Sequence, residues 1–212
     1  MTGAGPLARG VASGDMAVLR ARSFAEAREY MIVAMSDCDR EVSIERTATF
    51  THGDQLASSF LARCAGGPTR EFTFTVDPPA RDEQPLLFAT GSQPSELLDA
   101  GQWYAVVNRY VAQAQQAQQR MTTGHMDEPT VTAFLDSFGN ARAAAVEVLK
   151  FIPGGQQVPP DAAFWSEYGQ AVRRAQAEQL TRPALEQIVR DVDSVFQAFQ
   201  SEADRQARGT GR

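Results

Sequence analysis

The 212-residue sequence contains only two cysteines, two histidines and one lysine. Cys38 and Cys64 form no CxxC pair, which excludes the spacing typical of zinc ribbons and thioredoxin-like redox sites. A chain of this length buries a core without a disulfide framework, so we expect both cysteines to act as small apolar side chains. Any Schiff-base chemistry would depend on Lys150.

Long apolar runs are also missing. None approaches the roughly 18 residues that a membrane span needs, and residues 1–15 have no apolar centre of a secretory signal. We therefore expect a flexible leader over 1–15, no membrane association and a cytoplasmic location.

Basic clusters are missing as well. The net charge is −6, and residues 1–90 and 91–212 each carry three more acidic than basic side chains. Nucleic-acid binding needs a basic surface, so we expect no nucleic-acid partner. A protein partner fits this charge, and a basic one fits it most easily.

Motifs for catalysis are absent too. The sequence has no GxxxxGK[ST], GxSxG or HExxH pattern. His52 lies in the turn of one predicted hairpin and Cys64 at the far end of its second strand, roughly 27 Å away, which is too far for a catalytic dyad. His52 and His125 each lie beside acidic residues and would form a metal site only if their loops met. We expect no cofactor and no metal, and a non-enzymatic role is favoured.

Period-2 alternation dominates residues 41–90. Even positions are mainly apolar and odd positions mainly polar, which predicts strands with one dry and one wet face. Turn residues separate four such segments, at about 41–51, 55–64, 70–77 and 85–90. The fold class predicted is α+β, with a four-stranded antiparallel meander covered by helices and a C-terminal three-helix layer.

The same alternation predicts how the strands pair. A three-residue loop at 52–54 keeps the apolar residues of both flanking strands on one face, because a slip of one residue would turn every side chain over. The facing pairs expected from this rule are Phe50–Leu56, Ile44–Ala62, Ala62–Phe72, Phe60–Phe74 and the ion pair Arg63–Glu71.

Helical periodicity occupies most of the remaining sequence. Ser23 is the expected cap of a helix over 23–38, and residues 16–22 are compatible with a short preceding strand. Further helices are predicted at about 94–119, 127–152, 161–179 and 181–203. The helix over 94–119 has two apolar stripes, which indicates contacts on two sides. We expect one α+β domain over 16–204, comprising a helix–meander–helix part (16–120) and a helical part (127–204), followed by a frayed tail over 205–212.

Three aromatic residues stand out as candidate binding residues. Phe164, Trp165 and Tyr168 lie close together in the predicted helix 161–179. Two interpretations are open: a core anchor or an aromatic patch that binds a partner. The function predicted is a non-enzymatic protein-binding or regulatory module of the adaptor, chaperone or inhibitor type. The alternative is a small-molecule pocket between sheet and helices, lined by Phe60, Phe72, Phe74, Tyr104 and Met31.

Overall fold

The computed structural model describes residues 17–209, except 39, 77–87, 89–90 and 125–126. These residues form a four-stranded mixed sheet and five α-helices. The elements are β1 (Val18–Ala21), α1 (Phe24–Ala34), β2 (Val42–His52), β3 (Gln55–Cys64), β4 (Thr69–Val76), α2 (Ala100–Thr122), α3 (Glu128–Leu149), α4 (Glu167–Ala175) and α5 (Arg182–Gly209), with short 3₁₀ turns η1 (Asp161–Ala163) and η2 (Ala177–Gln179).

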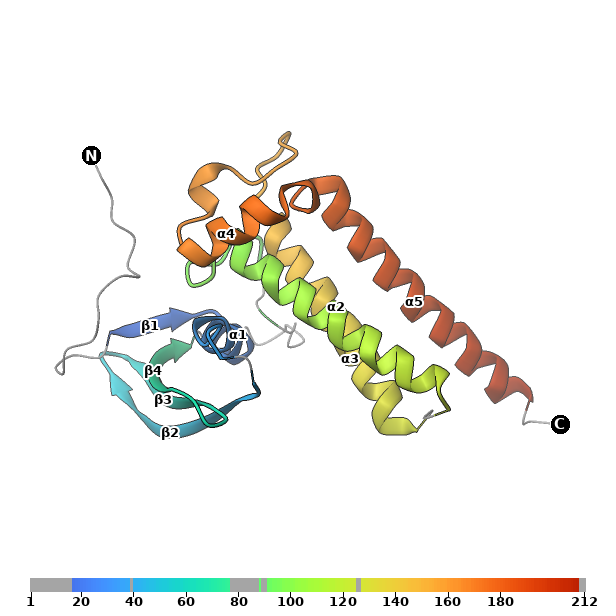
Figure 1. Ribbon diagram of the computed structural model, residues 1–212, viewed down its shortest axis with the longest axis horizontal. Coiled ribbons are helices and arrows are strands. Elements are labelled where there is room, and N and C mark those ends of the chain that lie inside the picture. The colour runs from blue at the N-terminus through green and yellow to red at the C-terminus, as the bar shows by residue number, and fades with distance from the viewer. Residues whose placement is uncertain (1–16, 39, 77–87, 89–90, 125–126, 210–212) are drawn as a thin grey trace.

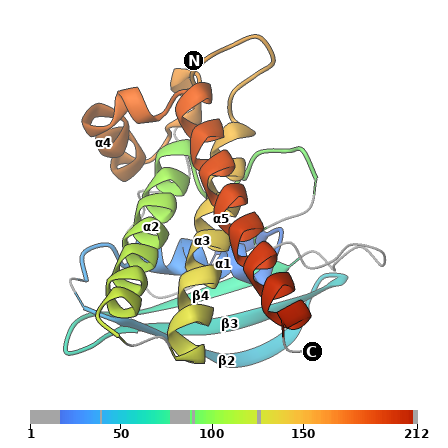
Figure 2. The same ribbon diagram turned by 90° about the vertical axis from the view of Figure 1, so that its right-hand side faces the viewer.

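The elements are stacked in layers (Figure 1). The sheet is one outer layer, α1 lies on one of its faces, α2 and α3 lie beyond α1, and α5 runs along α3. Figure 2 shows the long helices standing above the sheet with α1 between them. One hydrophobic cluster joins these layers, from Phe74 of the sheet through Met31 of α1 to Trp103, Val148 and Leu185 of the long helices.

The sheet confirms the α+β class but not the antiparallel meander. Its strand order is β1-β4-β3-β2, and β1 runs parallel to β4. Leu19 pairs with Phe74 and Ala21 with Val76, so β1 extends the dry face of β4 by one strand. Of the predicted strand over 85–90, only Phe88 lies within the described residues, and it occupies a bend.

The turn of the β2–β3 hairpin contains two residues instead of the expected three. Gly53 has a φ of 58°, a positive angle that suits tight hairpin turns. Phe50 therefore pairs with Ala57, and the expected pairing with Leu56 is wrong. Near the turn, the turn geometry and not the apolar pattern decides which residues pair. As a result, Phe50 and Leu56 are 41% and 68% exposed.

A β-bulge at Thr47 restores the predicted register further along the hairpin. The register shifts between Arg46 and Ala48, and beyond it Ile44 pairs with Ala62 as expected. A bulge adds one residue to one strand only. The side chains of β2 therefore change faces at this point, which simple alternation did not predict.

The β3–β4 pairing differs from the expected one by two residues. Phe60 pairs with Phe72, two positions from the expected partner, because the turn at 64–68 closes more tightly than assumed. A shift of two residues preserves which face each side chain occupies. The expected pair of Arg63 and Glu71 is wrong for the same reason.

Helix α1 covers the dry face of the sheet. The Ser23 hydroxyl accepts a hydrogen bond from the Glu26 amide at 3.0 Å and caps the helix as predicted. The Tyr30 ring meets Phe72 and Phe74 edge-on, at centroid distances of 6.0 and 5.9 Å. The two strand aromatics therefore point inward, as the parity of the sequence predicted.

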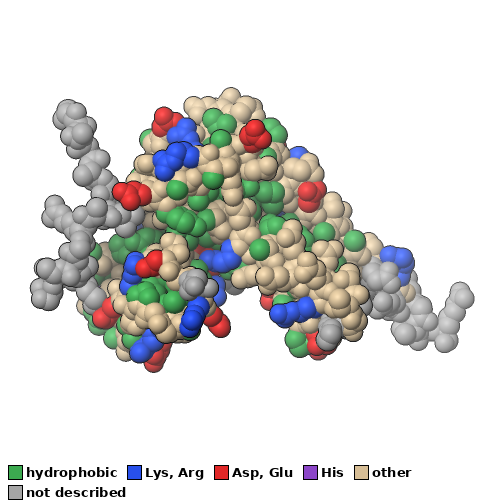
Figure 3. All heavy atoms as spheres, viewed as in Figure 1, with side chains coloured by type: hydrophobic (Ala, Val, Ile, Leu, Met, Phe, Trp, Pro, Cys, Tyr) green, Lys and Arg blue, Asp and Glu red, His purple; other side chains and the backbone are tan. Residues whose placement is uncertain are grey.

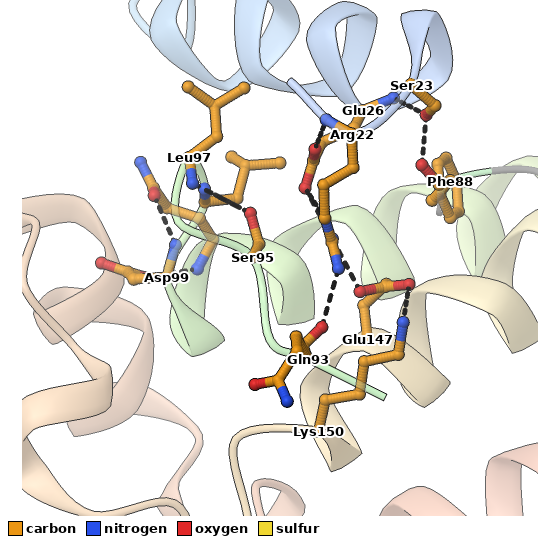
Figure 4. Close-up of polar contacts among 12 residues, drawn as sticks. Arg22, Ser23, Glu26, Phe88, Gln93, Ser95, Leu97, Asp99, Glu147 and Lys150 are labelled. Atoms are coloured by element: carbon orange, nitrogen blue, oxygen red, sulfur yellow. Dashed lines mark hydrogen bonds and ion pairs between the residues drawn. The ribbon is translucent and has the colours of Figure 1, made fainter. Parts of the chain in front are cut away.

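A buried ionic network joins the start of α1 to α3 (Figure 4). Arg22 Nη2 lies 2.5 Å from Glu26 and 2.8 Å from Glu147, and Nη1 donates to the Gln93 carbonyl at 2.9 Å. Lys150 Nζ completes the network at 2.6 Å from Glu147. Both carboxylates are almost fully buried. The cations therefore offset the free-energy cost of removing these negative charges from water.

The start of α2 is fixed against α4 by Asp99. This side chain accepts hydrogen bonds from the Gln102 amide at 2.8 Å and the Ser166 amide at 2.8 Å. Gly101 and Gly169 make the approach possible, since a Cβ on Gly101 would lie 2.3 Å from the Gly169 carbonyl oxygen. α2 therefore begins at residue 100 instead of 94, and the predicted helix 161–179 is divided into η1, α4 and η2.

The bulge generates a testable contrast between two deletions. Deleting Thr47 removes only the extra residue, so every strand pair and facing is preserved and the melting temperature is expected to change by a few degrees at most. Deleting Ser43 instead turns Val42 away from α1 and brings Glu41 inward. Val42 is half-buried, so the lost burial is worth about 1 kcal/mol, less than the value of about 1.5–3 kcal/mol for a fully buried side chain.

Thermal unfolding followed by circular dichroism compares the two deletions. Equal destabilisation of both variants would show that Thr47 is not a removable bulge residue.

Candidate functional site

The three predicted aromatic residues have different surroundings. Phe164 is buried, and Trp165 is half-buried with its ring 6.0 Å from that of Phe151. Tyr168 is 40% exposed. The structure therefore does not bring the three together on one exposed surface, and only Tyr168 reaches the cleft described below.

The structure places one of the two histidines and all five residues that were expected to line an apolar pocket. His52 is exposed at the hairpin end, and His125 lies outside the described residues. Five residues were expected to line an apolar pocket between sheet and helices. Phe72 is half-buried, and the other four are buried: Met31, Phe60, Phe74 and Tyr104.

A cleft of about 480 Å³ lies between α1 and α2. Its walls are the C-terminal half of α1, the following segment up to residue 42, the middle of α2, and Tyr168 from α4. Figure 3 shows the surface hollowed between the sheet and the long helices, with basic side chains (blue) on both sides of the hollow. The polar lining residues are Arg28, Ser36, Arg40, Glu41, Arg109, Tyr110, Gln113 and Tyr168.

Glu29 lies behind this lining and is held by three donors. Its side chain is 1% exposed, and it accepts a hydrogen bond from Tyr110 Oη at 2.7 Å. Arg109 Nη2 forms an ion pair with it, and Arg28 Nη1 lies 3.2 Å away. The guanidinium of Arg109 also lies 4.9 Å from the centre of the Tyr110 ring. Fully bonded groups of this kind are rigid, so these residues give the cleft a fixed base.

The sequence contained a signal for this cluster that alternation and motifs did not use. Glu26 and Glu29 precede the buried residues Tyr30 and Val33 by four positions, so both carboxylates belong to the inward face of α1. Arg22, the cationic partner of Glu26, lies four positions before it, so helical spacing could have indicated this pair. Arg109, which pairs with Glu29, comes from a distant segment that spacing could not identify.

Burial raises the pKa of the Tyr110 phenol, and the negative charge of Glu29 raises it further. The nearby cations Arg109 and Arg28 act in the opposite direction. Tyr110 therefore stays protonated and donates to Glu29 well above neutral pH. The pKa values of Tyr30 and Tyr104 are also raised by burial.

Alkaline unfolding tests the role of Tyr110. Its folded pKa lies above the unfolded value of about 10, so its contribution to stability is intact below that pH and is lost as the pH rises through the folded pKa. The free energy of unfolding in urea is expected to fall as the pH rises above about 10. The Tyr110→Phe variant should show a smaller fall in the free energy of unfolding. Tyr30 and Tyr104, whose pKa values are also raised, contribute equally to the fall in both proteins. An identical fall would exclude this role.

A disulfide between Cys38 and Cys64 forms part of the cleft wall. Their Cα atoms are 5.8 Å apart, and Cys38 lines the cleft. Cys64 ends β3 on the face covered by α1, and the chain returns toward it after α1 ends. The expectation of two independent apolar cysteines is therefore wrong, because the fold brings together residues that are 26 positions apart.

Removing the disulfide should destabilise the protein. The two cysteines are 26 positions apart, and a closed loop of this length contributes about 3.5 kcal/mol in the chain-entropy description. A phosphine reductant or the double substitution Cys38→Ser/Cys64→Ser should therefore lower the urea midpoint. The double variant is the control, since the reductant should not affect it further. An unchanged wild-type midpoint with two titratable thiols would contradict the prediction.

Comparison with known proteins gives no identification. No protein-family model matches the chain, and no curated protein or solved structure was found to resemble it. Within the described ranges, no group of three or more His, Cys, Asp or Glu side chains is arranged to hold a metal ion. In the same part of the chain, no helix has both the length and the apolar character required to cross a membrane.

Proposed function

We propose that the protein is a non-enzymatic protein-binding module and that the α1–α2 cleft is its binding site. The observation that carries this proposal is an open cleft with a rigid base and an exposed aromatic residue, Tyr168, at its edge.

The dimensions and side chains of the cleft support binding. Its volume of about 480 Å³ falls within the range of about 300–1,000 Å³ typical of ligand sites. Tyr168 is 40% exposed, and the side chain of Arg28 is 58% exposed. Tyrosine and arginine are among the residues that contribute most to binding energy at protein interfaces.

The chemical state of the cleft residues favours binding over catalysis. Glu29 accepts bonds from three donors and is not placed as a free general base. Cys38 is in a disulfide and supplies no thiolate nucleophile.

A small molecule is the second candidate ligand, because the cleft volume also suits one. This site differs from the apolar pocket expected between sheet and helices, since its lining is largely polar. Native mass spectrometry of the purified protein would show such a ligand as a discrete added mass that disappears on denaturation.

An arrayed library of random 12-residue peptides tests the protein-binding proposal. Wild-type protein is expected to select peptides with a shared sequence pattern. Tyr168→Ala should weaken the selected peptides by about tenfold, equivalent to about 1.4 kcal/mol, because a partner would cover this ring.

Phe50→Ala is the matched control, since Phe50 is 41% exposed at the distant hairpin end. Melting temperatures of both variants identify any unfolding. The proposal fails if no peptide pattern emerges, or if Phe50→Ala weakens binding and Tyr168→Ala does not.

A further inference from the structure

We infer that the α1–α2 cleft recognises carboxylates, and that its partner presents an acidic segment rich in Asp or Glu. This inference rests on the proposed function and specifies the chemistry of the partner.

The charge of the cleft is opposite to that of the whole chain. The lining contains three guanidinium groups, from Arg28, Arg40 and Arg109, and one carboxylate, from Glu41. With Glu29 behind them, the cleft keeps an excess of one positive charge, although the chain has a net charge of −6. An anionic group would therefore gain electrostatic energy here that most of the surface does not provide.

Arg109 positions the site. It is paired with the buried Glu29 and lies over the Tyr110 ring, so it gives the cleft a fixed positive charge. Substituting Arg109 would leave Glu29 without its ion pair and would disturb folding. It is therefore unsuitable as a test of ligand contact.

Arg28 has the geometry of a direct ligand. Both of its hydrogen bonds to the described residues leave from Nη1, to Glu29 at 3.2 Å and to Tyr110 at 3.4 Å. Nε and Nη2 remain for a ligand, and these two nitrogens form the fork that binds a carboxylate through two parallel hydrogen bonds.

Arg40 supplies a second guanidinium from a different element. It extends from the segment after α1, beside the disulfide, and is exposed. Its Nη1 donates to the Ala65 carbonyl at 3.3 Å, which leaves further donors for a ligand. Two guanidinium groups on separate elements suit successive carboxylates of an extended acidic peptide.

A phosphorylated side chain is the other anionic group that an arginine fork binds. It places a charge near −2 at one point, whereas successive carboxylates place one negative charge at each of the guanidinium groups of Arg28 and Arg40, which come from separate elements. A phosphopeptide is therefore treated as the competing outcome.

Fluorescence anisotropy tests the inference with two labelled peptides, one containing a run of six Glu and the other a run of six Gln. The Glu peptide is expected to bind the full-length oxidised protein, more weakly at high salt. Arg28→Gln and Arg40→Gln should each weaken it by about fivefold or more.

Arg63→Gln is the matched control, because it makes the same charge change at an exposed side chain of the sheet, where the nearest carboxylate is 3.9 Å away. The inference is overturned if the Gln peptide binds equally well, if Arg63→Gln weakens binding as much as Arg28→Gln, or if a phosphoserine peptide binds more tightly than the Glu peptide.

Two further measurements separate this inference from the proposed function. If the peptide library yields an uncharged pattern that depends on Tyr168, the protein-binding function holds and carboxylate recognition is overturned. If no peptide binds but glutarate shifts the NMR signals of Arg28 and Tyr110, and not those of Arg63, carboxylate recognition holds and the protein-binding function fails.

Discussion

The arrangement of layers depends on Arg22, which lies between the end of β1 and the start of α1. Its guanidinium binds Glu26 of α1 and Glu147 of α3, so one side chain links the sheet, its covering helix and the long helices (Figure 4). Both carboxylates are buried, and a buried ion pair that loses one partner leaves a charge that the interior does not tolerate. This network fixes α1 relative to α3, and α2 packs against α3. The width of the α1–α2 cleft therefore depends on a contact outside the cleft.

Helix α1 combines two roles that a simple amphipathic helix does not. Tyr30 and Met31 cover the sheet with apolar surface, while Glu26 and Glu29 are buried carboxylates that require cations. Arg22 pairs with Glu26 at the start of α1, and Arg109 of α2 pairs with Glu29. The cations of the cleft are thus partly a consequence of folding, since a buried carboxylate needs arginines nearby. Arg28 and Arg40 are the exceptions, because both are exposed and neither is required to neutralise Glu29, which Arg109 already pairs.

Local patterns predicted the elements, and tertiary contacts decided the rest. Alternation predicted β2, β3 and β4 and the inward direction of Phe72 and Phe74, since one buried face imposes period 2. Alternation could not show that Gly53 shortens a turn or that Thr47 adds a residue, because the apolar residues stand at even positions on both sides of each feature. The parallel β1 and the pairing of Cys38 with Cys64 join residues far apart in sequence. Disulfides are uncommon in reducing compartments, so the cytoplasmic location expected from the sequence stays a prediction.

The bulge at Thr47 has a consequence for the outer border of the sheet. β2 is one of the two edge strands, and its outward-facing backbone groups offer a template on which another strand could add. The register of β2 shifts halfway along the strand, next to Glu45 and Arg46. A regular strand could therefore form hydrogen bonds with β2 over only part of its length. Edge strands of this kind resist aggregation through sheet-to-sheet pairing. The residue that disturbs the hairpin register thus also protects the protein from adding strands at its open side.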